Sequence, residues 1–133
     1  MSNRVVARYR DGRVLKGTSL DAAGRRPLIH VRPPGGSPVE VAMKDLKALF
    51  FVRSLEGDPT HDEALEPDES DVRGRGSTPV RIVFEDGEVI VGLSISNPPK
   101  GDYFFIVPVD PRSNNQRILV NRGAVAEVEI VRG

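Results

Sequence analysis

The sequence predicts an all-β protein made of two tandem five-stranded small barrels, joined by a flexible acidic linker. The main observation is a hairpin that occurs twice, "ARYRDGRVLKG" at residues 7–17 and "IVFEDGEVIVG" at residues 82–92. In addition, no segment of useful length has the period of an amphipathic helix. Because five short strands in an open sheet would leave two edges unpaired, closure into a small barrel is the expected arrangement.

Each hairpin is identified by its turn. The pairs Asp11-Gly12 and Asp86-Gly87 lie between runs of β-branched and aromatic residues, and Asp-Gly supplies the positive φ values of a type I′ turn. Gly17 and Gly92 occupy equivalent places, five residues beyond each turn glycine. Since a glycine within a strand often permits a sharp bend, both are predicted at barrel corners.

The likeness of the two halves continues beyond the hairpins. Residues 27–33 match residues 103–109, because both read as alternating strands that run into a proline. Residues 39–52 match residues 117–131, and both read as two strands separated by a short polar step. Five strands are therefore predicted in each half.

The chain divides into three parts of different charge. The first barrel, residues 1–56, carries eleven Lys and Arg against five Asp and Glu. The linker, residues 57–77, carries seven acids against two arginines and is rich in Pro, Gly and Ser, so it is predicted to be disordered. The second barrel, residues 78–133, is nearly balanced. The net charge of zero argues against strong nonspecific binding to nucleic acid.

The composition favours a cytoplasmic protein that does not insert into a membrane. No apolar run approaches the length of a membrane span, and the first ten residues lack the hydrophobic core of a signal peptide. The chain has no cysteine, which excludes disulfides and thiolate metal sites.

Catalysis is not expected. His30 is predicted to point outward from a strand, and His61 lies in the linker. The spacing of carboxylates around these two histidines does not suggest a metal site. No nucleophile motif, P-loop or dinucleotide fingerprint is present. The protein is therefore predicted not to be an enzyme and not to need a cofactor.

The order of these motifs resembles the Sm-like fold. Residues 80–92 resemble the first Sm motif and residues 118–131 resemble the second, including its Arg-Gly pair at Arg122-Gly123. The first half has Lys44-Asp45 in place of that pair. The resemblance implies two Sm-like barrels and binding of single-stranded, U-rich RNA, with Arg122 contacting the RNA. The phrases "VEVAMKDLKALFFV" and "DPRSNNQRILV" also resemble an uncharacterised bacterial family built from this tandem unit.

Basic residues of the first half form a second candidate site. If the barrel brings them together, they could bind an anionic group of RNA, a nucleotide or an acidic protein segment. A solvated surface and a cover formed by the acidic linker are the alternatives. The residues are Arg8, Arg10, Arg25, Arg26, Arg32 and Arg53.

Phe50 and Phe51 lie on opposite faces of one predicted strand. One of them can fill the barrel core, and the other needs a second apolar surface. That surface could be supplied by the other barrel or by another molecule. Residues 110–117 are predicted to form a polar turn, with a hydrogen-bonding loop for a ligand as the alternative.

These observations predict a non-enzymatic protein-interaction or adaptor module. Its contacts would be made by the arginines of the first barrel together with Phe50 or Phe51. Sm-like RNA binding through Arg122 is the alternative function, and self-association is a further expectation.

Overall fold

The computed structural model describes residues 2–23, 26–67, 76–96 and 99–131. It confirms the all-β class, because the described residues hold ten strands and no α-helix. The first five strands are β1 (Asn3–Tyr9), β2 (Val14–Ser19), β3 (Leu28–Val31), β4 (Val39–Ala42) and β5 (Leu46–Val52). The second five are β6 (Thr78–Phe84), β7 (Val89–Ser94), β8 (Tyr103–Pro108), β9 (Asn115–Asn121) and β10 (Val125–Ile130).

The predicted polar steps are short 3₁₀ helices. They are η1 (Met43–Asp45) between β4 and β5, and η3 (Arg122–Ala124) between β9 and β10. Neither described helix is long enough to cross a membrane. Each half therefore has the same order of elements: four strands, a 3₁₀ turn and a fifth strand.

The two Asp-Gly turns are present, but the type I′ prediction is wrong. Among the described residues only glycines have positive φ, with Gly12 at 97° and Gly87 at 92°. The amide of each glycine donates to the carbonyl three residues earlier, at Tyr9 and Phe84. The positive φ therefore falls on the glycine alone, as in a type I turn followed by a left-handed residue, and the aspartates avoid strain.

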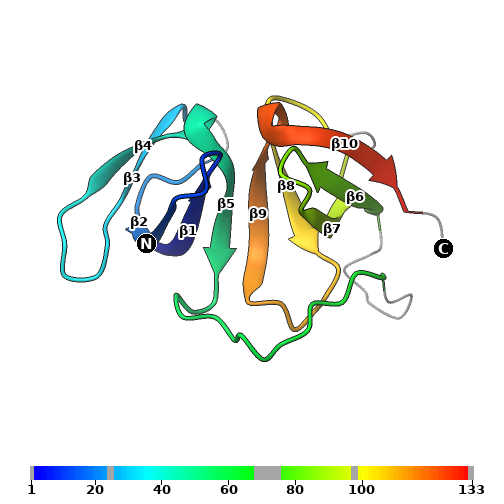
Figure 1. Cartoon of the computed structure of the whole chain (residues 1–133), viewed down its shortest axis with the longest axis horizontal. Helices are drawn as coiled ribbons and strands as arrows, with labels where there is room; N and C mark the ends of the chain where they lie inside the picture. The colour runs from blue at the N-terminus through cyan, green and yellow to red at the C-terminus, as the bar shows by residue number, and fades with distance from the viewer. Residues whose placement is uncertain (1, 24–25, 68–75, 97–98, 132–133) are drawn as a thin grey trace.

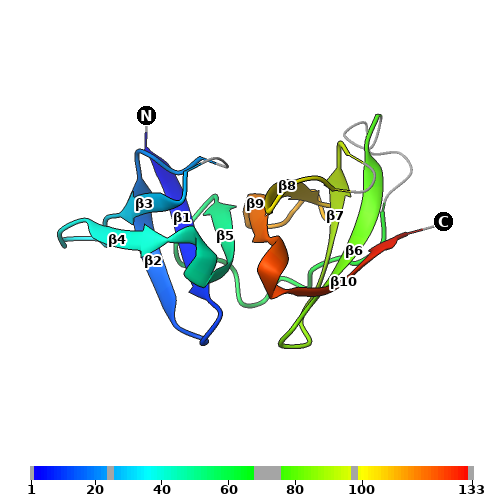
Figure 2. The same cartoon turned by 90° about the horizontal axis from the view of Figure 1, so that it is seen from above.

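The predicted closed barrels are not confirmed, because one sheet runs through both halves. Eight strands form it in the order β10-β6-β7-β8-β9-β5-β1-β2, and β3 and β4 form a separate pair. Figures 1 and 2 both show β5 and β9 side by side at the centre of the molecule. Since β5 uses its two edges for β1 and β9, it has no edge left for β4. Likewise β9 pairs with β8 and β5, which leaves no edge for β10.

The β5–β9 pair lies between two cores and belongs to both. Every residue of β5 is buried. Phe50 packs in the second-half core with Ile82 and Phe104, whereas Phe51 packs in the first-half core with Ile29. Both phenylalanines are thus buried on opposite faces of β5, and neither forms an exposed contact surface.

A buried lysine joins the halves beside the shared strands. Lys47 Nζ lies 2.7 Å from Asp86 Oδ2, contacts Glu88 Oε1, and lies 4.7 Å from the centre of the Phe84 ring. Only 9% of the Lys47 side chain is exposed. Because Lys47 comes from β5 and its partners come from the β6–β7 turn, the ion pairs fix the second hairpin against the first half.

Candidate functional site

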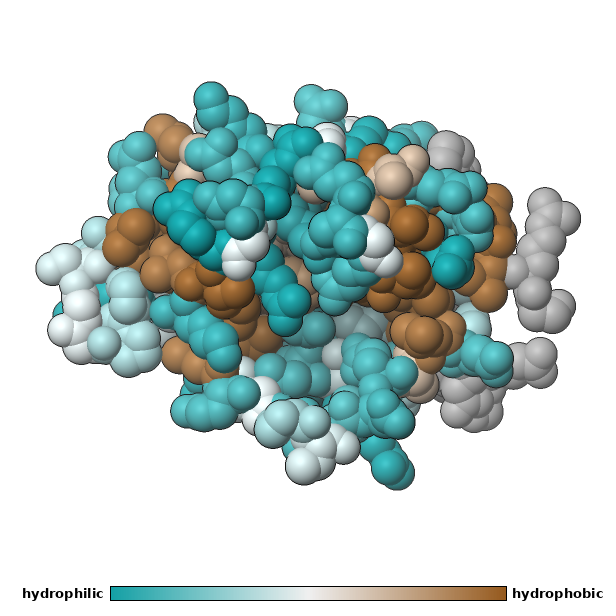
Figure 3. Space-filling view, in the orientation of Figure 1, coloured by the Kyte–Doolittle hydropathy of each residue, from teal (hydrophilic) through white to brown (hydrophobic). Residues whose placement is uncertain are grey.

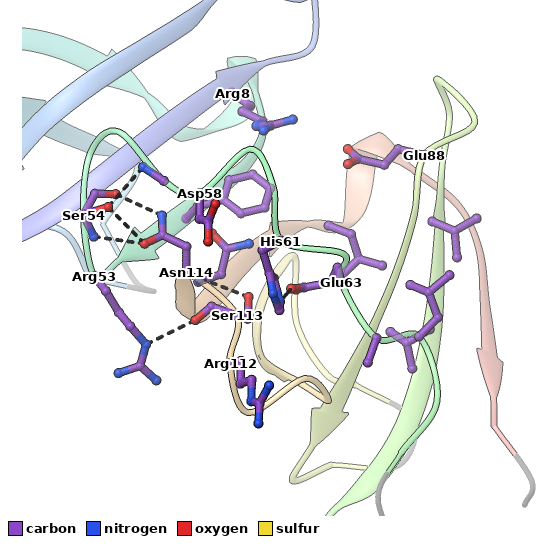
Figure 4. A pocket seen from close by; sticks show the side chains of 18 residues that line it. Arg8, Arg53, Ser54, Asp58, His61, Glu63, Glu88, Arg112, Ser113 and Asn114 are labelled. Carbon is purple, nitrogen blue, oxygen red and sulfur yellow. Dashed lines mark hydrogen bonds and ion pairs between the residues drawn. The ribbon is translucent and has the colours of Figure 1, made fainter.

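A pocket of about 660 Å³ lies between the two halves and is the main candidate site. Figure 4 shows that its side chains come from β1, β5, the segment after β5, strand β7 and the loop between β8 and β9. The first-half lining includes Arg8, Phe50, Arg53 and Ser54, and the segment after β5 contributes Asp58, His61, Glu63 and Leu65. The second half contributes Glu88, Val89, Ile90, Val91, Arg112, Ser113, Asn114 and Asn115.

Three residues nominated from the sequence meet at this pocket. The Arg8 guanidinium lies 5.1 Å from the centre of the Phe50 ring, which gives a cationic wall backed by an aromatic ring. Arg53 follows β5 and donates from Nε to the Ser113 carbonyl at 3.1 Å. Arg8, Phe50 and Arg53 therefore line one site, although Phe50 itself is only 4% exposed.

The opposite wall is a half-paired strand. β8 pairs with β7 only at Gly92 and Leu93, and one further bond runs from Val109 N to Val91 O. In the β6–β7 hairpin, Phe84 N donates to Glu88 O, so by alternation the backbone of Val89 points away from β6. Within the described part of the chain, no backbone group pairs with this side of Val89.

The linker and the β8–β9 loop are tied together at one end of the pocket. Asn114 Oδ1 accepts from Ser54 N at 3.0 Å, and Asn114 Nδ2 donates to Ser54 O at 2.9 Å. Ser54 Oγ in turn accepts from Gly57 N at 3.0 Å. The start of the linker is thus held against Ser54, which is itself bonded to the second half through Asn114. Disorder of the linker beyond the described residues 57–67 stays a prediction.

A histidine and two carboxylates meet where the linker crosses the loop. His61 Nε2 lies 2.8 Å from Asp110 Oδ2 and 3.4 Å from Glu63 Oε1. Burial by itself raises the pKa of Asp110, but hydrogen bonds from the Ala64 and Arg112 amides and from His61 outweigh burial and lower it. This cluster could not be predicted from the sequence, because His61 and Asp110 are 49 residues apart and belong to no common motif.

Among the described residues, the nominated arginines Arg10, Arg26, Arg32 and Arg122 do not line the pocket. Arg10 makes a two-pronged ion pair with Glu85, at 2.9 and 3.0 Å, and donates to the Gly123 carbonyl at 3.0 Å. The Glu85 hydrogen bond raises the pKa of Arg10. Arg10 thus links the first half to the second and is engaged within the molecule.

Two further arginines lie beside the small β3–β4 sheet. Arg26 Nη2 is 3.9 Å from Asp21 Oδ2, and Arg32 Nε donates to the Gly36 carbonyl at 3.0 Å. Arg25 lies outside the described residues. The described arginines of this set are therefore divided among the pocket (Arg8 and Arg53), the contact between the halves (Arg10) and the β3–β4 region (Arg26 and Arg32).

Arg122 and Phe51 are also engaged within the chain. Arg122 Nε donates to the Gly101 carbonyl at 2.9 Å, and its guanidinium lies 5.0 Å from the centre of the Phe104 ring. Phe51 is buried beneath Arg117, whose guanidinium lies 4.2 Å from the ring centre. The arginine that the Sm resemblance assigns to RNA thus holds the loop before β8.

Comparison with known proteins gives a family and nothing finer. Searches of curated proteins and of solved structures found no match. One family model covers residues 1–132, and its description is a family of unknown function, DUF6982. The match spans both halves and the linker, so the chain belongs to the DUF6982 family of unknown function.

Proposed function

We propose that this protein is a non-enzymatic interaction module that binds an extended, acidic segment of a partner protein in the pocket between its halves. The observation that carries the proposal is that the backbone of Val89 pairs with no other described residue on the side away from β6, and that Val89 and Arg8 both line the pocket. An added strand gains main-chain hydrogen bonds from such an edge, and side-chain pockets give specificity.

The strand edge supports an extended ligand. Val109 already donates to the Val91 carbonyl before the chain turns away at Asp110. A bound segment would continue that ladder at Val89, where one amide and one carbonyl are available. Val89 and Ile90 are partly buried, so the ligand would cover apolar side chains as it pairs.

The charges of the pocket favour carboxylates on the ligand. Among the described residues, Arg8 and Arg112 make no ion pair through their guanidinium groups. The acidic residues of the lining already have partners: Asp58 with Thr60, Glu63 with His61, and Glu88 with Lys47. An acidic segment would therefore meet cations that have no carboxylate of their own.

The molecular surface supports a mixed polar and apolar ligand. Figure 3 shows two apolar areas separated by a hydrophilic band on the face that it presents. A ligand that crossed this face would meet both kinds of surface, and backbone pairing would have to supply much of its affinity.

Peptide phage display on the immobilised protein tests the proposal. We expect enrichment of peptides that combine Asp or Glu with β-branched residues, and about tenfold weaker binding by Arg8→Glu in fluorescence anisotropy. Arg26→Glu is the matched control, since this exposed arginine lies outside the pocket. Failure to enrich any sequence, or equal binding by wild type and Arg8→Glu, would refute the proposal.

Sm-like binding of single-stranded RNA is the second candidate. Its support is the resemblance of residues 80–92 and 118–131 to the two Sm motifs, which here fall on the β6–β7 hairpin and on β9 and β10. Anisotropy with labelled U-rich and A-rich RNA at two salt concentrations tests it. Tight, salt-sensitive binding that Arg122→Ala weakens would favour RNA over the acidic peptide. A cytoplasmic location and self-association remain proposals alongside both functions.

A further inference from the structure

The cluster at the crossing of linker and loop has the composition of a metal site. The ligand atoms of His61, Glu63 and Asp110 all lie within 4.8 Å of one another. We propose that these three residues bind a divalent transition-metal ion, with Zn²⁺ as the best fit, on the wall of the pocket. This inference goes beyond peptide binding, because the cluster would bind the ion whether or not a peptide is present.

The distances suit a small tetrahedral ion. With metal–ligand bonds of roughly 2.0–2.2 Å, the donor atoms of a tetrahedral zinc site lie about 3.3–3.6 Å apart. His61 Nε2 and Glu63 Oε1 are already 3.4 Å apart. His61 Nε2 and Asp110 Oδ2 are 2.8 Å apart, so this pair must widen by about half an ångström, and the ligand atoms of Glu63 and Asp110 lie within 4.8 Å of each other.

The backbone orients the aspartate before any ion arrives. Asp110 Oδ1 accepts from Arg112 N at 2.8 Å, and Asp110 Oδ2 accepts from Ala64 N at 2.8 Å. Only 6% of the Asp110 side chain is exposed. Hydrogen bonds of this kind hold a ligating carboxylate in place and are typical of the surroundings of metal ligands.

The histidine and the glutamate approach from one short stretch of linker. His61 N donates to the Asp58 carbonyl at 3.1 Å, and Thr60 N donates to Asp58 Oδ1 at 3.0 Å, which folds the chain just before His61. Glu63 is 40% exposed and can adjust its position. Figure 4 shows the side chains of His61 and Glu63 directed toward each other within the pocket lining.

The ligand types discriminate among ions. One imidazole with two carboxylates suits Zn²⁺, whereas Mg²⁺ and Ca²⁺ prefer oxygen ligands alone. Three protein ligands leave a fourth position of a tetrahedral ion, and the cluster borders the pocket, so this position would be open to water or to a ligand carboxylate.

Isothermal titration calorimetry of the full chain, stripped with EDTA, tests the proposal. With ZnCl₂ we expect one site per chain of micromolar or tighter affinity, and with MgCl₂ no binding at the same concentrations. His61→Ala and Glu63→Gln should each weaken Zn²⁺ binding at least tenfold. Visible absorption of the Co²⁺ form should report tetrahedral coordination and should be lost in His61→Ala.

The matched control is His30→Ala. His30 Nδ1 also lies 2.8 Å from an aspartate, Asp21 Oδ2, but no third ligand joins this pair among the described residues. Unchanged Zn²⁺ binding by His30→Ala is expected. Absence of binding to the wild type, or equal affinity in wild type and His61→Ala, would overturn the proposal. Because the titration contains no peptide, its failure is distinct from failure of the proposed function.

Discussion

Two glycines at equivalent places in the hairpins have different neighbours. A Cβ built on Gly17 would lie 2.2 Å from the Arg32 carbonyl oxygen, where β2 meets the single bridge to Arg32. A Cβ on Gly92 would lie 2.8 Å from Ile106 Cδ1 and 2.9 Å from Ile106 Cβ, so it would meet this side chain both at its end and at its base. At both positions an added methyl group would overlap with a neighbouring residue. At Gly17 it would meet the backbone of Arg32, whereas at Gly92 it would meet the side chain of Ile106.

We therefore expect Gly17→Ala to be the more harmful substitution. Gly17→Ala should lower the free energy of unfolding by about 3 kcal/mol, and Gly92→Ala by about 1–2 kcal/mol, because the overlap at Gly92 is smaller and requires a shift of Ile106 by only a few tenths of an ångström. Urea unfolding followed by circular dichroism measures both values. Gly36→Ala is the control, since its Cβ would make only ordinary contacts and should change stability by less than about 0.5 kcal/mol. Equal losses at the two hairpin positions would contradict this account.

Single residues also show what the sequence could and could not predict. The turn glycines and the polar steps were found, because each depends on a local property of the chain. Lys47 was missed, because a lysine in a strand is ordinarily expected to point to solvent, whereas its carboxylate partners come from a turn 39 residues away. The cluster of His61 and Asp110 was missed for the same reason.

At the scale of elements, the β3–β4 pair is the part least attached to the large sheet. Apart from the Thr18–Arg32 bridge, Asp21 connects it to the end of β2. Asp21 Oδ1 accepts from His30 N at 2.8 Å and from Ser19 Oγ at 3.1 Å. Burial by itself raises the pKa of Asp21, but these bonds and the His30 ring lower it from 3.8 to about 2.

This low pKa predicts a pH dependence of stability. Since the folded-state pKa is depressed, the stabilisation is complete above about pH 4 and is lost as the pH falls toward 2. Asp21→Asn should cost about 2 kcal/mol at pH 6, and the difference from wild type should shrink between pH 4 and pH 2. Urea unfolding across this range measures it. Glu40→Gln, on the exposed part of β4, is the control, and a difference independent of pH would refute the assignment.

The pairing of β5 with β9 could not be predicted from the sequence. The five strands of each half could be read from alternation and turns, but closure depends on which edges meet. "ALFFV" did indicate a strand that buries both faces, and Phe50 and Phe51 do pack on opposite cores. Its partner strand β9 carries Arg117 and Asn121, and the pattern of that segment gave no reason to join it to β5.

At the scale of the whole molecule, the halves are joined through shared packing. The core of the second half includes four residues of the first half: Val6, Ala48, Phe50 and Val52. The core of the first half includes Leu119 of the second half. Asn121, from β9, donates to the Leu46 carbonyl at 2.8 Å and is itself buried. Neither core is therefore complete without residues of the other half, and the pocket between them depends on their staying together.

We expect the chain to unfold as one cooperative unit. Methyl NMR of labelled isoleucines can follow Ile29 in the first-half core, and Ile82 and Ile106 in the second, through one urea titration. The native-state methyl signals of all three isoleucines should disappear with the same midpoint in urea concentration. Val31→Ala, which opens a cavity in the first-half core, should lower stability by about 2 kcal/mol and should shift the midpoints of Ile82 and Ile106 as much as that of Ile29. If Val31→Ala shifted Ile29 alone, the halves would be independent domains connected only by the linker, and a pocket formed by both would not be a stable binding site.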